Sequence, residues 1–176
     1  MTPAQQTALE ALAGRAFDAG ELATLTPLVA ARNDVAIAAT LSPLRDPVIA
    51  ERRVSELGVR RALGVVDASR LMGILKASAA AAEAGSVEPW LAAVLTGLGV
   101  SAGDHPAYQE TVGSAWRWLT QPEGLDVGSA AARDMLDLIA AGNADAAPAC
   151  VAIKALAEED APVSVGEVSA ALNGAA

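Results

Sequence analysis

Alanine dominates this sequence and restricts the folds that it can adopt. The chain has 43 alanines among 176 residues, whereas phenylalanine, tryptophan and tyrosine together number five. Alanine has the highest helix propensity of the amino acids, and its small side chain lets helices approach closely. Each buried alanine, however, removes much less apolar surface from water than a leucine does. We therefore predict helices around a thin core of modest stability, which contacts with partners help to order.

Helix start and stop signals recur along the whole chain. Three pairs of residues have the capping-box spacing, in which an N-cap side chain and the side chain three residues later each bind the other's backbone amide. These pairs are Thr2 with Gln5, Asp18 with Glu21, and Ser164 with Glu167. No segment alternates like a strand. We predict an all-α fold, a compact bundle of about eight to ten short helices, as a single domain (1–176) or two subdomains (1–64 and 65–176).

Residues 42–56 interrupt the helical pattern. Ser42-Pro43 and Asp46-Pro47 lie close together, and the apolar residues after them form no sustained helical stripe. Proline biases the residue before it toward extended geometry. A non-helical segment of this length in a compact domain is usually functional or disordered. The sequence therefore predicts an extended arm at 42–56.

The charge distribution bears on which partners the chain can bind. A net charge of −9 argues against nucleic-acid binding, which depends on Lys and Arg side chains that neutralise phosphates. The charge is uneven, because residues 1–76 carry nine positive and eight negative side chains, whereas residues 77–176 carry three positive and thirteen negative. An acidic half of this kind can steer association with a basic partner.

Five arginines form the one basic stretch of the chain. They are Arg45, Arg52, Arg53, Arg60 and Arg61. Three acids, Asp46, Glu51 and Glu56, lie among them. Two interpretations stay open, namely an internally paired, solvated face or a docking arm for an acidic partner.

Trp116 and Trp118 are two positions apart on a predicted helix and point to different sides of it. Either both side chains belong to the core, or one of them lies at the surface. Exposed tryptophan and arginine are favoured anchors of protein interfaces. Trp118 therefore joins the five arginines as a candidate partner-binding residue.

No pattern in the sequence indicates catalysis or metal binding. His105 is the only histidine and Cys150 the only cysteine, so neither a zinc site nor a nucleophile–base triad can be assembled. We expect His105 to lie in a loop or cap, and Cys150 to be a small buried apolar residue. The acids Glu158–Asp160 and the pair Asp134 and Asp137 suit exposed surfaces. No phosphate-binding glycine loop occurs. We predict no enzyme activity, no cofactor and no metal.

The compartment can also be predicted from the sequence. A single cysteine suits a reducing compartment such as the cytoplasm, and the N-terminal residues show no signal-peptide pattern. The longest uncharged stretch, 89–103, has 15 residues, fewer than the ~20 that a membrane-spanning helix needs. We predict no membrane insertion.

Three groups of segments stand out, namely 28–39 with Leu41-Ser42, then Trp118-Leu119 with 124–129 and 133–136, and finally 156–158 with 160–165 and 168–172. Together they resemble small, uncharacterised, Ala-rich helical proteins encoded by tailed bacteriophages and prophages. The resemblance implies a phage origin and a setting in the virion or its tail, and it brings no assigned activity with it.

Two functions follow as expectations. The first is a structural or adaptor protein of a tailed-phage virion, associated with the tail or tail fibre, made in the host cytoplasm. It would bind other virion proteins or copies of itself as an oligomer, with the 42–56 arm reaching a neighbour. The second is an acidic phage-encoded regulator or inhibitor that binds a host protein.

Overall fold

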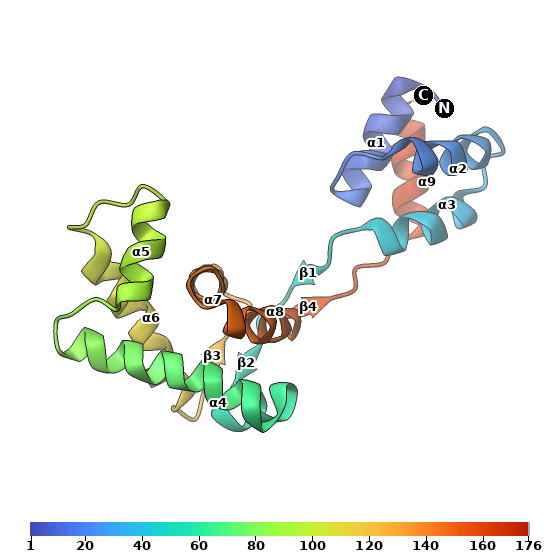
Figure 1. Ribbon diagram of the computed structural model, residues 1–176. Coiled ribbons are helices and arrows are strands. Elements are labelled where there is room, and N and C mark those ends of the chain that lie inside the picture. Colours follow the sequence, from blue (N-terminus) through green and yellow to red (C-terminus); the bar gives the residue numbers. More distant parts are fainter. Residues whose placement is uncertain (176) are drawn as a thin grey trace. The chain divides into compact units, whose positions relative to one another are not determined.

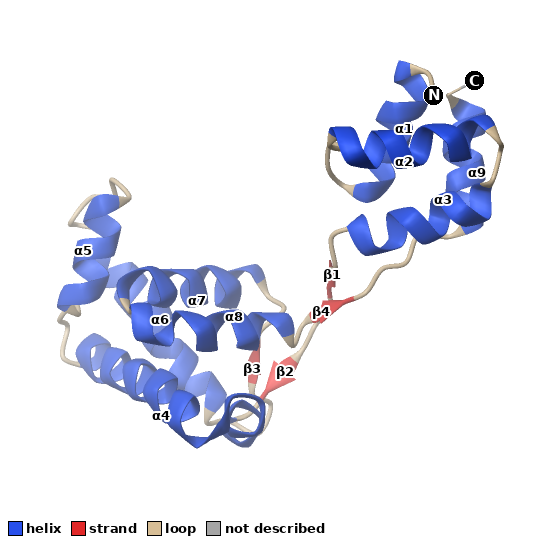
Figure 2. Ribbon diagram, turned by 45° about the vertical axis from the view of Figure 1, so that its right-hand side comes forward, coloured by secondary structure: helices blue, strands red, loops and turns tan. Residues whose placement is uncertain are grey.

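Nine α-helices make up most of residues 1–175, the part of the chain that this computed structural model describes (Figure 1). Figure 2 shows how little of the chain is strand: the described residues contain four strands of two residues each. The predicted all-α class and the predicted number of helices are confirmed. No helix of residues 1–175 is both long enough and apolar enough to cross a membrane. The chain forms two compact units, described in turn.

The first unit combines both ends of the chain, Met1–Val48 and the residues from Glu159 onward. Its helices are α1 (Pro3–Ala13), α2 (Ala19–Ala30), α3 (Asp34–Leu41) and α9 (Val165–Gly174), and a short 3-10 turn, Ser42–Leu44, follows α3. The last helix, α9, packs against α1 and α3, as Figure 1 shows. The apolar core of this unit consists of Leu9, Ala13, Phe17, Leu25, Val29, Ile37, Ala38, Leu41, Val163, Val168 and Leu172.

The predicted helix boundaries in the first unit are largely confirmed, because they depend on local hydrogen bonds. All three capping boxes form, with both reciprocal bonds present in each. Gly14 ends α1 with φ 78°, a left-handed conformation that favours glycine. Asn33 caps α3 by accepting a hydrogen bond from the Ala36 amide.

The second unit is the continuous segment Ile49–Glu158. It contains β2 (Arg53–Val54), α4 (Glu56–Glu83), α5 (Pro89–Gly97), α6 (His105–Leu119), β3 (Leu125–Asp126), α7 (Ala130–Gly142), a 3-10 turn (Ala144–Ala146) and α8 (Ala147–Ala155). Helix α4 packs against α6 and α8, while α7 packs against α5 and α8. The apolar side of α7 is buried, with Met135, Leu136 and Ile139 among the least exposed side chains.

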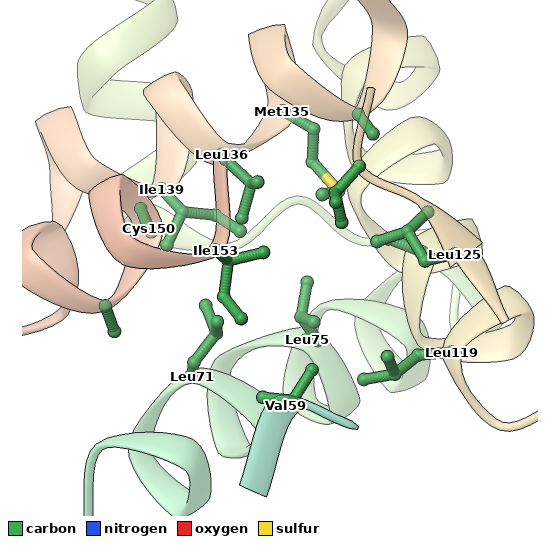
Figure 3. Packing of buried hydrophobic residues seen from close by; sticks show 14 of the residues in the cluster. Val59, Leu71, Leu75, Leu119, Leu125, Met135, Leu136, Ile139, Cys150 and Ile153 are labelled. Atoms are coloured by element: carbon green, nitrogen blue, oxygen red, sulfur yellow. The ribbon is translucent and has the colours of Figure 1, made fainter. Parts of the chain in front are cut away.

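Side chains from all of these elements converge on one core, part of which Figure 3 shows. Figure 3 labels Val59, Leu71 and Leu75 from α4, Leu119 from α6, Leu125 from β3, Met135, Leu136 and Ile139 from α7, and Cys150 and Ile153 from α8. Alanines at 68, 79, 115, 132 and 149 are buried between the helices. They and Gly113 bring helix backbones close: a Cβ on Gly113 of α6 would lie only 3.0 Å from the Ala79 Cα of α4.

The prediction that residues 42–56 leave the helical pattern is confirmed, since most of this segment is extended backbone. It starts with the 3-10 turn, continues through β1 (Val48–Ile49), which pairs with β4 (Glu158–Glu159), and ends in β2, which pairs with β3. Backbone hydrogen bonds with distant segments satisfy the extended chain, which local sequence patterns do not reveal.

The proposed boundary between subdomains also differs from the structure. No unit ends near residue 64, although α4 is kinked there, where Gly64 departs from helical geometry with φ 74° and ψ 177°. The first unit is instead discontinuous in sequence, since the residues from Glu159 onward complete it. Sequence periodicity cannot show that a helix at the end of the chain packs on helices at its beginning.

Candidate functional site

A hollow beside Trp118 contains two of the predicted binding residues. Its volume is about 280 Å³, and we call it the Trp118 hollow. It lies between the end of α6, the following turn, β3 and β2. Its lining consists of Arg53, Trp118, Gln121, Glu123, Gly124, Leu125, Asp126 and Ser129.

The pairing of β2 with β3 brings Arg53 into this hollow. The strands are antiparallel, with Arg53 opposite Asp126 and Val54 opposite Leu125. The Asp126 carboxylate accepts hydrogen bonds from the backbone amides of Arg52 and Gly128, both at 3.0 Å. These bonds hold the segment before α4 against the segment after α6, although the two lie 74 positions apart in sequence.

Two glycines allow this close approach. A Cβ on Gly124 would lie 2.7 Å from the carbonyl oxygen of Val54, and Gly124 itself has φ 74°. A Cβ on Gly128 would lie only 1.9 Å from the carbonyl oxygen of Ala50. Any other residue at these positions would push the strands apart, so the glycines fix the wall of the Trp118 hollow.

The Trp118 side chain is 45% exposed, whereas its neighbour Leu119 is buried. Trp116 is half-buried and packs against the core of the unit. The interpretation that placed both tryptophans in the core is therefore wrong for Trp118. The Arg53 guanidinium donates to the exposed carboxylate of Glu51 at 3.0 Å, and this pair lies at the surface.

The five predicted arginines are divided between the two units. Arg45 belongs to the first unit, where it pairs with Glu167 of α9 at 3.2 Å. Arg60 pairs with Glu56 one helical turn before it, at 2.9 Å. Among the described residues, Arg52 and Arg61 are in no ion pair, and both are exposed. Three of the five arginines are thus paired internally, and Arg53 alone shares the hollow with Trp118.

A second hollow, of about 440 Å³, also includes Arg53. Its lining consists of Glu51, Arg52, Arg53, Val54, Ser55, Gly58 and Leu156. Arg53 therefore borders two hollows, with Trp118 in one and Arg52 in the other. The residues of β3 and of the turn before it were not predicted as part of the site, because no local sequence signal pairs them with β2.

The single histidine and the single cysteine lie apart from this site. His105 is buried, and its Nε2 lies 3.3 Å from the Val100 carbonyl oxygen. It is the first residue of α6, next to the predicted loop or cap position. Cys150 is fully buried in the core, as predicted. Burial, together with the nearby Asp137 carboxylate, raises the pKa of the Cys150 thiol to about 11.

The acidic residues singled out from the sequence lie at the surface. Asp134, Asp137 and the three acids at 158–160 are all exposed. Asp137 pairs with Lys154, and Glu158 pairs with Arg133 at 2.8 Å. Within residues 1–175, no three His, Cys, Asp or Glu side chains lie close enough together to hold a metal ion.

The Trp118 hollow combines a large aromatic surface, a guanidinium and two carboxylates, which suits the recognition of another protein's side chains. It is open to solvent on the side of Trp118 and Arg53, which are both exposed. The chain matches no protein-family model, no curated protein and no solved structure, so its function must be argued from these residues and their geometry.

Proposed function

We propose that this chain is a non-catalytic adaptor protein of a tailed-phage virion, associated with the tail or tail fibre, that binds a neighbouring virion protein at the Trp118 hollow. We propose this surface because Trp118 is exposed and lines the same hollow as Arg53. Tryptophan and arginine are enriched among the residues that dominate interface energies. The virion setting rests on the resemblance of the three groups of segments to phage-encoded proteins.

The charges at the hollow indicate the chemistry of the partner. The pair between Arg53 and Glu51 is exposed, and such surface pairs contribute about 0–1 kcal/mol. A partner carboxylate can therefore replace Glu51 and form a bidentate bond with the Arg53 guanidinium. An apolar side chain next to that carboxylate would cover Trp118. The partner surface is thus an acidic residue flanked by an apolar one.

Photo-crosslinking within purified particles tests this proposal. A photoreactive amino acid replaces Gln121, an exposed residue of the Trp118 hollow, and a matched variant carries it at Val151, an exposed residue of α8 outside the hollow. We expect the variant at position 121 to crosslink to a single virion protein and the variant at position 151 not to do so. Absence of the protein from purified particles would refute the virion setting.

A second test addresses the surface itself. Trp118→Ala should weaken binding of the crosslinked partner by about 2 kcal/mol or more, as expected for a central interface tryptophan. Arg53→Ala should weaken it as well, whereas Val151→Ala should leave it unchanged. Equal affinities for all three variants would show that the partner binds elsewhere.

One observation favours a second candidate, the acidic regulator of a host protein. All three basic residues of 77–176 pair with nearby acids, namely Arg117 with Glu110, Arg133 with Glu158 and Lys154 with Asp137. Only four of the thirteen acids of that half are in ion pairs, since Glu167 pairs with Arg45. This function predicts binding to a basic host protein that weakens steeply with salt. Protein that occurs only outside particles, with such binding, would favour it over the adaptor.

A further inference from the structure

A second surface of the Ile49–Glu158 unit is apolar and has acidic residues at its edge. Its lining consists of Leu98, Tyr108, Asp134, Asp137, Leu138 and Ala141, its volume is about 420 Å³, and we call it the Leu98 hollow. It shares no residue with the Trp118 hollow. Three elements form it, since Leu98 follows α5, Tyr108 is in α6 and the other four residues are in α7.

The backbone geometry at the end of α5 leaves the Leu98 side chain exposed to solvent. Gly99 ends α5 in a left-handed conformation with φ 76°, and the Val100 amide donates to the Leu95 carbonyl at 2.9 Å. This bonding pattern fixes the helix end and leaves Leu98 67% exposed, next to Tyr108, which is 38% exposed. Clustered exposed apolar side chains of this kind are typical of contact surfaces.

The charges around the Leu98 hollow are negative. On α7, Asp134, Asp137, Leu138 and Ala141 have the spacing of one helix face. Asp137 pairs with Lys154, whereas Asp134 is exposed and is in no ion pair among residues 1–175. The occupant that complements this surface presents an apolar side chain with a cation beside it.

The first turns of α4 present such a pair. Leu57 is 56% exposed, and Arg61, one helical turn later, is exposed and in no ion pair among the described residues. Residues four apart on a helix lie on the same face, so Leu57 and Arg61 form one stripe. The neighbouring Arg60 already pairs with Glu56. The stripe thus offers a leucine and an available guanidinium.

The stripe cannot fill the hollow of its own chain. Within the Ile49–Glu158 unit, the beginning of α4 and helix α5 lie at opposite ends in both Figure 1 and Figure 2. A contact between them must therefore join two molecules.

We infer that copies of this chain associate head to tail, with the Leu57–Arg61 stripe of one copy in the Leu98 hollow of the next. Leu57 packs against Leu98, Tyr108 and Leu138, and Arg61 pairs with Asp134. Because the two surfaces differ, the contact is heterologous and repeats from copy to copy until a ring closes or a filament grows. This inference does not depend on the Trp118 hollow or on the proposed function, although repeated copies suit a virion protein.

Sedimentation velocity over a series of protein concentrations, at about 0.15 M salt, tests the inference. We expect the mass of the unaltered protein to rise beyond that of a dimer as its concentration rises. Leu98→Asp blocks the hollow but keeps the stripe, and Leu57→Asp with Arg61→Glu destroys the stripe but keeps the hollow. Each change should weaken association at least about tenfold, since each buries a charge in an apolar contact.

Mixing the two altered proteins gives the sharpest result. One contributes an intact stripe and the other an intact hollow, so the mixture should form pairs and nothing larger. A chain that carries both Asp134→Arg and Arg61→Glu should regain the association that each change alone weakens. Circular dichroism confirms that every variant is folded, which we expect because the altered residues are exposed.

Three results would overturn the inference. The first is an unaltered protein that stays monomeric throughout the series, in which case a different chain occupies the hollow. The second is a mixture of the altered proteins that does not pair. The third is a loss of association in the control Val151→Asp as large as that in Leu57→Asp, which would show that the contact lies elsewhere. Val151 is an exposed residue outside both surfaces, so we expect this control to leave association unchanged.

Discussion

Two glycine-to-alanine substitutions should shift the stability of the second unit in opposite directions. Gly73 lies inside α4 with no atom within 4 Å of an added Cβ, so Gly73→Ala gains helix propensity of about 1 kcal/mol without a clash. Gly113 lies inside α6 and gains the same propensity. Its Cβ, however, would lie 3.0 Å from the Ala79 Cα and the Ser78 carbonyl oxygen of α4, both rigid backbone atoms.

The clash at Gly113 should outweigh the propensity. Overpacking a well-packed core costs about 1–3 kcal/mol, and separating α4 from α6 also strains the buried hydrogen bond of 2.8 Å from the Gln109 Nε2 to the Ser78 carbonyl oxygen. With a clash of about 2–3 kcal/mol against a gain of about 1 kcal/mol, Gly113→Ala should destabilise the unit by about 1–2 kcal/mol. The thermal midpoint should fall by about 4–8 °C per kcal/mol for a domain of this size.

Tryptophan fluorescence during thermal unfolding measures this effect cleanly. All three tryptophans, at 90, 116 and 118, belong to the second unit, so the signal does not report on the first. We expect Gly73→Ala to raise the midpoint and Gly113→Ala to lower it. If Gly113→Ala unfolds at or above the midpoint of the unaltered protein, while Gly73→Ala behaves as expected, then α4 and α6 are not in close contact.

Three further predictions concern other positions. Gly64 has φ 74° and ψ 177° with no atom within 4 Å of an added Cβ. Gly64→Ala should therefore lower the free energy of unfolding by about 1–3 kcal/mol through backbone strain alone. An unchanged thermal midpoint would mean that α4 has no such kink. Burial raises the pKa of the Cys150 thiol to about 11. The native protein should therefore react with iodoacetamide at about pH 8 much more slowly than the urea-unfolded chain does. Equal rates would contradict the buried position. Hydrogen bonds lower the folded-state pKa of Glu10, Glu21 and Glu167, all in the first unit, below the ordinary value of 4.5. Their contribution to stability is present above that value and is lost as the pH falls through the folded-state pKa. Helical circular dichroism should therefore decrease in acid while tryptophan fluorescence is still native, and coincident loss of both signals would contradict this.

The parts of the fold that could be predicted from the sequence are those that local hydrogen bonds determine. Thr2, Asp18 and Ser164 cap their helices because each accepts a bond from an amide three residues later, which the spacing alone predicts. Helix α5 begins differently, at Pro89 after Glu88, whose side chain forms no capping hydrogen bond.

The candidate site was only half predictable, because its walls come from distant parts of the chain. Trp118 and Arg53 could be singled out from their residue types and their neighbours. Their meeting in one hollow depends on the Asp126 carboxylate and on Gly124 and Gly128, which allow two backbones to touch. Arg45 shows the opposite error: it is close to Arg53 in sequence, yet its partner is Glu167 of the first unit. Proximity in sequence thus grouped residues that belong to two different units.

The segment around residue 50 also connects the two units, because the second unit is inserted into the sequence of the first. The chain leaves the first unit through β1 and returns through β4, and these strands pair with one another. An inserted unit must begin and end at nearby points, or the host unit could not close around it. The prolines and the extended backbone of 42–56 meet that requirement, and the cost of closing so long an insertion rises only slowly with its length. The backbone partners of this segment lie in residues 125–127 and 157–159, where no nearby sequence signal announces them. A proline-rich break in a helical chain therefore indicates either a contact with another molecule or the start of an insertion, and the two differ in whether a matching extended segment occurs later in the chain.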